Sequence, residues 1–135
     1  MTDPNVPMDR KKILKSAVPV AGNVATTITV PAGERWLLLN VAVELTTDAT
    51  VANRLINIYT RDIAAVDKFR NTSNAIAAST TAAKYFSREI SAVSTTVNSL
   101  GYQILDAGED VYISVYLGQA GDAYDYLVEY LKVEI

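Results

Sequence analysis

The stretch that decides the fold is Arg35-Trp-Leu-Leu-Leu-Asn-Val-Ala-Val-Glu-Leu-Thr46. Its odd-numbered positions from 37 to 45 are all apolar, whereas Asn40, Glu44 and Thr46 mark the even-numbered side. Alternation with a period of two residues is typical of a β-strand with one buried face. We therefore expect a long strand whose odd-numbered side chains enter the core and whose other face meets solvent or a neighbouring subunit.

The same alternation recurs along the chain, and turn-forming residues separate its segments. About eight strands at regular spacing predict an all-β fold, a single β-sandwich that is most simply a jelly roll. Between residues 62 and 83 the pattern is weaker, and a single helical turn would fit there. The strands are expected near residues 24–30, 35–46, 52–62, 66–70, 84–89, 102–105, 111–117 and 124–135. The predicted core contains Leu37, Leu39, Val41, Val43, Val111, Ile113 and Val115.

The chain has 135 residues and contains neither cysteine nor histidine. That length suits one domain. Without the two missing residue types there is no disulfide, thiolate nucleophile, imidazole base or zinc site built from them. We predict that the protein is not an enzyme and needs no cofactor. No run reaches the roughly 18 apolar residues of a membrane span, and the start lacks signal-peptide features, so we expect cytoplasmic synthesis and no membrane partner.

Charge divides the chain into a basic N-terminal segment and an acidic body. Residues 1–15 carry four cationic and two anionic side chains, whereas residues 16–135 carry eight and thirteen. An acidic body argues against a nucleic-acid partner. We expect residues 1–20 to form an extended basic arm that docks on an acidic partner surface, ahead of a sandwich domain at 21–135. A frayed, solvated tail is the alternative.

Tyrosine is concentrated near the C-terminus, where six of the eight lie within the last 34 residues. Aromatic strand faces occur in subunit interfaces and in carbohydrate platforms, and cross-strand packing explains them equally. The scarcity of tryptophan favours an interface over sugar binding. The candidate partner-binding residues are Arg10, Lys11, Lys12, Lys15, Trp36, Tyr112, Tyr116, Tyr124, Tyr126 and Tyr130.

Five carboxylates form a second group of candidates: Asp106, Glu109, Asp110, Asp122 and Asp125. They fall on loops that a sandwich can bring together, and such a group is what a calcium site or a glycosidase pair requires. The spacing is not that of an EF-hand, and loop carboxylates commonly solvate turns. Metal binding and hydrolysis therefore remain the weaker alternatives.

One turn pattern occurs twice, as Val30-Pro-Ala-Gly-Glu-Arg-Trp36 and as Leu105-Asp-Ala-Gly-Glu-Asp-Val111. Two equivalent corners of a double Greek key would produce this repeat. Independent use of a favourable turn before a strand explains it as well, and that explanation is preferred.

The run from Val30 to Arg54, which ends in Leu-Thr-Thr-Asp-Ala-Thr-Val-Ala-Asn-Arg, resembles small structural proteins of tailed bacteriophages. Those proteins show a VPAGKRW-like turn, an apolar strand and a TTxATVGNR-like segment. The similarity continues through the 66–70 strand, Ala77-Ala-Ser-Thr-Thr81 and the Ala107-Gly108 turn, and covers roughly residues 28–118. This chain has Glu34 in place of the usual Lys and Ala52 in place of Gly.

The resemblance implies a virion component with a β-sandwich fold, most simply a capsid decoration (cement) protein on the capsid surface. It implies no catalytic residues. The expected partners are further copies of the chain, as a homotrimer, and the major capsid protein. A ligand- or carbohydrate-binding virion module, such as a tail, baseplate or receptor-binding accessory protein, is the alternative.

Overall fold

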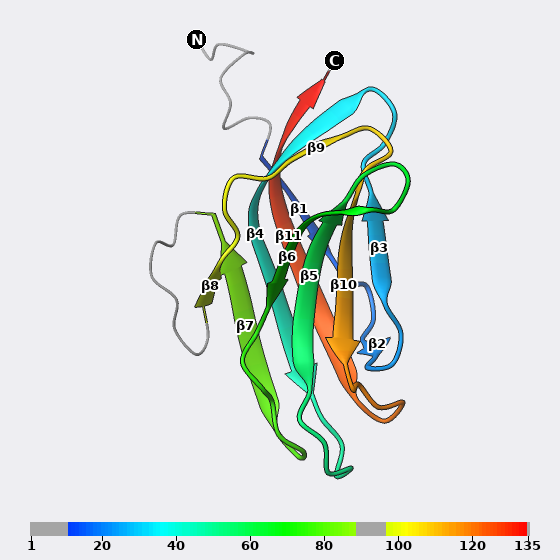
Figure 1. Cartoon of the computed structure of the whole chain (residues 1–135), viewed down its shortest axis with the longest axis vertical. Coiled ribbons are helices and arrows are strands. Elements are labelled where there is room, and N and C mark those ends of the chain that lie inside the picture. Colours follow the sequence, from blue (N-terminus) through cyan, green and yellow to red (C-terminus); the bar gives the residue numbers. More distant parts are fainter. Residues whose placement is uncertain (1–10, 89–96, 135) are drawn as a thin grey trace.

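The protein is a β-sandwich of two packed sheets, seen one behind the other in Figure 1, which confirms the predicted all-β class. The structure, a computed structural model, describes residues 11–88 and 97–134. Those residues form eleven strands and no helix. The helical turn considered for residues 62–83 is therefore absent from this segment, which contains a strand, a loop and the start of another strand.

One sheet has seven strands and the other has four. All pairings are antiparallel except that of β7 with β8. The seven-stranded sheet contains β1 (Lys11–Lys15), β2 (Val20–Ala21), β4 (Glu34–Thr46), β7 (Thr81–Ser87), β8 (Val97–Ser99), β9 (Ile104–Asp106) and β11 (Ala123–Glu134). The four-stranded sheet contains β3 (Thr26–Thr29), β5 (Leu55–Arg61), β6 (Asp67–Thr72) and β10 (Asp110–Tyr116).

The core lies between the sheets and consists mainly of aliphatic side chains from β4, β5, β10 and β11. Val41, Val43, Val111 and Ile113 are buried as predicted, and Val115 packs against the core while partly exposed.

Leu37 and Leu39 are only half-buried, so their predicted place in the core is wrong. The pairing of β4 with β11 slips by one residue at Leu39, which leaves that residue as a β-bulge. One inserted residue reverses the faces of a strand, because side chains alternate with a period of two. Before the bulge the even-numbered Trp36 and Leu38 are buried, and after it the odd-numbered residues 41–45 are.

The two similar turns are neighbouring corners of the sandwich. Gly33 and Gly108 have φ of 82° and 86°, a region that favours glycine. The first turn carries the chain from β3 to β4 and the second from β9 to β10, while β3 pairs with β10 and β4 with β9. The turns are thus equivalent corners of the sandwich.

The N-terminal segment is part of the sandwich from residue 11 onward, so the expected boundary at residue 20 is wrong. Strand β1 pairs along its whole length with the C-terminal strand β11, from Lys11 opposite Leu131 to Lys15 opposite Leu127. Only Leu14 of β1 packs against the core. Residues 1–10 of the expected arm lie outside the described residues.

Candidate assembly surface

The seven-stranded sheet has an outer face that none of the described strands covers. Strands β1, β11, β4 and β7 form it side by side, because their alternate side chains point away from the core. We call these side chains the outer face: Lys11, Ile13, Lys15, Leu127, Glu129, Leu131, Asn40, Ala42, Glu44, Ala83 and Tyr85. Ile13 and Tyr85 are 54% and 48% exposed, so the face offers apolar and aromatic groups to solvent.

The outer face contains a hollow of about 320 Å³, and all four strands contribute residues to its lining. Ala42 and Ala83 lie on adjacent strands, and their small side chains leave room that a larger residue would fill. Tyr85 and Leu127 also line this hollow, as do the charged groups Lys15, Glu44 and Asp125.

A second, more polar hollow of about 220 Å³ lies further along the same face. It is lined by Leu39, Asn40 and Ser87, together with Lys11 and Glu129. The last two form an ion pair of 2.9 Å between β1 and β11. The bulge therefore matters for this surface, because it moves Leu39 out of the core and into the wall of this hollow.

The basic candidates lie on β1 at the edge of this face. Lys11, Lys12 and Lys15 are exposed, and Arg10 lies outside the described residues. Within the described part of the chain, Lys15 and Glu44 have no ion-pair partner.

Three of the aromatic candidates are buried and unavailable to a partner, which corrects the prediction for Trp36, Tyr124 and Tyr130. The rings of Trp36 and Tyr130 stack inside the sandwich with centroids 3.9 Å apart. The Tyr124 hydroxyl donates to the carbonyl of Val24 at 2.8 Å. Burial raises the pKa of Tyr124 and of Tyr130, as expected for phenols removed from water. Tyr126 is half-buried against the core.

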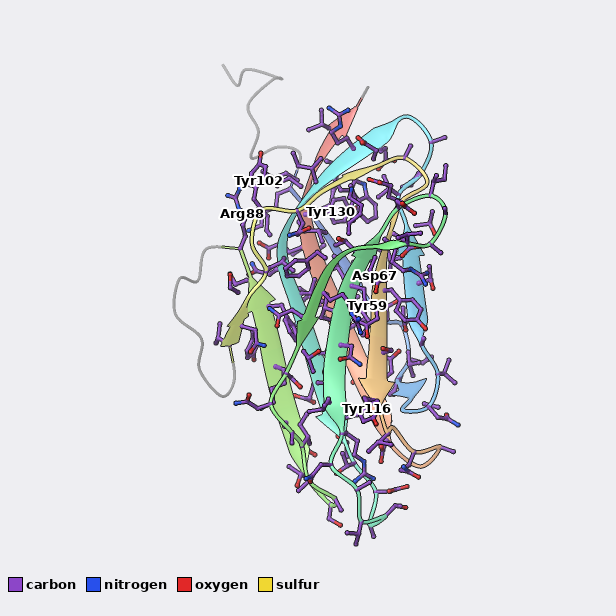
Figure 2. All side chains as sticks on the ribbon, viewed as in Figure 1. Tyr59, Asp67, Arg88, Tyr102, Tyr116 and Tyr130 are labelled. Atoms are coloured by element: carbon purple, nitrogen blue, oxygen red, sulfur yellow. The ribbon has the colours of Figure 1, made fainter. Side chains whose placement is uncertain are left out.

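Tyr112 and Tyr116 lie on the opposite side of the molecule, on the outer face of the four-stranded sheet, and Figure 2 shows Tyr116 at the lower end of β10. Tyr112 stacks on Tyr59 at 5.8 Å. Arg61 lies 4.1 Å from the centre of the Tyr112 ring, and another arginine lies over Tyr59. Because arginines and the neighbouring ring already contact the ring faces, Tyr59 and Tyr112 make a poor stacking platform for sugar.

The five candidate carboxylates do not gather in one place. Asp110 and Asp122 lie at opposite ends of the sandwich, because β10 separates them. Four of the five form ion pairs with basic side chains: Asp106 with Arg35, Glu109 with Lys68, Asp110 with Arg61 and Asp122 with Arg54. Among the described residues no three His, Cys, Asp or Glu side chains are placed to hold a metal ion.

The sequence did not predict a buried cluster around Arg54, which is fully buried. Its Nε and Nη2 donate to the two carboxylate oxygens of Asp122 at 2.9 and 3.0 Å, and Nη2 also donates to Asp48 at 2.8 Å. Its Nη1 donates to the carbonyls of Thr50 and Ala52. The cluster ties the β4–β5 loop to the β10–β11 loop. The only signal in the sequence was an arginine at the end of the run from Val30 to Arg54.

Burial and hydrogen bonding have opposite effects on the pKa of Asp122. Burial would raise the pKa of its carboxyl, but hydrogen bonds from Arg54 and from the backbone N–H groups of Gln119 and Asp48 hold that pKa below its ordinary value. With every donor of Arg54 occupied and both carboxylates engaged, the arrangement is that of a structural ion pair.

Comparison of the chain with family models, with curated proteins and with solved structures found no match. Within the described residues there is no helix long and apolar enough to cross a membrane.

Proposed function

We propose that the protein is a structural component of a tailed-bacteriophage virion, most simply a capsid decoration protein that stabilises the head shell through subunit contacts. The observation that carries this proposal is the uncovered outer face of the seven-stranded sheet. Exposed apolar and aromatic groups there surround a hollow, as at surfaces that bind other proteins.

The order of the strands supports this assignment. With β2, β8 and β9 set aside, the two sheets have the orders β1-β11-β4-β7 and β3-β10-β5-β6. In these orders, the successive strands are distributed between the two sheets as in a jelly roll. This architecture recurs in viral capsid and lectin domains. We propose the jelly roll on this ground.

The proposed partners are further copies of the chain, for which the resemblance implies a trimer, and the major capsid protein. The exposed lysines of β1 supply cationic groups for an acidic shell surface. On this proposal the protein is made in the host cytoplasm, resides on the virion surface and has no catalytic role.

The alternative is a ligand- or carbohydrate-binding module of a tail or baseplate. Its strongest support in the sequence was the tyrosine-rich strands. The alternative is less favoured because Trp36, Tyr124 and Tyr130 are buried and the Tyr59–Tyr112 pair is flanked by arginines.

Binding to purified empty capsids that lack the protein tests the proposal. We expect saturable retention on capsids in a sucrose gradient, weakening with salt because exposed charges are screened. Lys12→Gln removes an exposed cation of β1 and should bind less, whereas Lys68→Gln removes one exposed cation from β6 and should bind as the wild type does. Absence of retention at low salt would reject the shell-binding role.

A further inference from the structure

We propose that the central hollow of the outer face is occupied by a second copy of this chain, so that two molecules pack face to face through their seven-stranded sheets. This inference rests on the proposed function in one respect only, namely that further copies of the chain are its partners. It goes beyond that proposal by naming the surface, the residues and the symmetry.

Shape is the first argument. Protein interfaces pack about as densely as protein interiors, so a solvent-open hollow of about 320 Å³ with an alanine floor is a place where side chains of a partner can pack. The outer face also carries the projections that such a hollow accepts. Ile13 and Tyr85 stand half-exposed on the two strands that flank β11 and β4. A single surface thus holds both the hollow and the groups able to enter it.

Charge is the second argument, and it selects a second copy over an unrelated partner. Lys15 lines the hollow together with two residues of opposite charge, Glu44 and Asp125, and within the described residues none of the three has an ion-pair partner. A surface carrying both members of a pair is complementary to itself. When two copies face each other, Lys15 of each can meet Glu44 of the other.

Area is the third argument. With about 3.3 Å per residue and 4.8 Å between strands, the full lengths of β1, β11, β4 and β7 present on the order of 600 Å². A standard stable interface buries about 800 Å² on each partner. Neighbouring loops can supply the remainder, so the face is large enough to hold two molecules together.

Symmetry follows from self-complementarity. When the same patch serves both partners, the contact is isologous, and two copies complete it. The inferred assembly is therefore a two-fold dimer, in place of the trimer that the resemblance implies.

The first test compares masses of the full-length protein by sedimentation equilibrium over a range of concentrations. We expect a dimer for the wild type. Ala42→Arg places a long cation on the floor of the hollow and should yield monomers. Ser114→Arg is the matched control, because it makes a small-to-arginine change at a central strand position on the outer face of the other sheet. It should remain dimeric, and circular dichroism checks that both variants are folded.

A charge exchange tests the pairing itself. Lys15→Glu and Glu44→Lys should each raise the dimer dissociation constant by about tenfold or more, because both symmetry-related pairs become repulsive. Mixing the two single variants in equal amounts should restore association, since every pair in the mixed dimer is again between opposite charges. A purely local effect of either substitution would not be reversed by mixing.

A wild type that is monomeric or trimeric overturns the inference, as does an Ala42→Arg variant that associates as the wild type does. Failure of the mixed variants to associate also overturns it. These outcomes are separate from the capsid-binding test, because a monomer that binds shells refutes the dimer and leaves the proposed function intact.

Discussion

At the scale of single residues, Arg54 shows how two loops far apart in sequence are held together. Its guanidinium has five N–H groups, and the five hydrogen bonds it makes use all of them. A buried charge is tolerated only when it is paired and its donors are satisfied. The buried carboxylate of Asp122 is satisfied in the same way. It pairs with Arg54 and also accepts hydrogen bonds from the backbone N–H groups of Asp48 and Gln119.

Replacing Asp122 by Asn should destabilise the fold strongly. The variant leaves a buried guanidinium without its main counter-charge and sets an amide N–H against a donor, for which a loss of about 3 kcal/mol is expected. Urea unfolding followed by circular dichroism measures this loss. The control is Asp106→Asn, which removes a carboxylate from an exposed pair with Arg35 and should change stability by less than about 1 kcal/mol. Equal effects in the two variants would contradict the structural role of the cluster.

The same carboxylate predicts how stability depends on pH. Because the pKa of Asp122 in the folded protein lies below its ordinary value of 3.8, the folded state binds this proton more weakly than the unfolded state. Its contribution to stability is therefore complete above pH 3.8 and is lost as the pH falls through the lower, folded-state pKa. Free energies of unfolding measured from about pH 6 down to about pH 2 should decline more steeply for the wild type than for Asp122→Asn. Parallel curves would argue against this linkage.

At the scale of elements, strand β4 decides both the core and the outer face. The bulge at Leu39 changes which side chains are buried, and it also accentuates the local twist. As a result the strand supplies Trp36 and Leu38 to the core from one half and Val41 and Val43 from the other. The same shift directs Leu39 to the polar hollow.

The bulge predicts opposite outcomes for two adjacent leucines. Leu38→Ala should cost about 2–5 kcal/mol, because Leu38 is fully buried and its removal leaves a cavity. Leu39→Ala should cost less than about 1 kcal/mol, as is usual for residues outside the core. Chemical denaturation of the two variants makes the comparison directly. If Leu39→Ala is the more damaging, the alternation runs unbroken through the strand and the bulge is wrong.

At the scale of the whole molecule, the first and the last described strands are joined in one sheet. Strand β1 covers an edge of the long C-terminal strand β11, and an uncovered edge invites pairing with other chains. The outer face depends on this arrangement, since β1 supplies Ile13 and Lys15 to it.

Two truncations separate the described strand from the segment before it. The reference is the melting temperature of the chain that lacks residues 1–10, because this variant retains β1 and every other described strand. Deleting residues 1–15 removes β1 and should lower that temperature by on the order of 5 °C and promote aggregation. Thermal melts and light scattering measure the two effects. Identical melts for both truncations would mean that β1 adds nothing to the sandwich.

The sequence by itself determined the all-β class and the approximate position of most strands, because alternation and turn chemistry are local properties. Residues 35–46 and 124–135 were recognisable as long strands from their composition alone. It also identified Val41, Val43, Val111 and Ile113 as core residues, since the alternation is unbroken around each of them.

Only the tertiary structure decided which face each half of β4 presents, which tyrosines are buried and which carboxylate pairs with Arg54. A bulge depends on the pairing of two strands, and no pattern within one strand reports it. The position of Tyr130 against Trp36 and that of Arg54 against Asp122 result from chain segments brought together across 94 and 68 positions. Such contacts are set by the register and packing of the sheets, which local propensity does not specify.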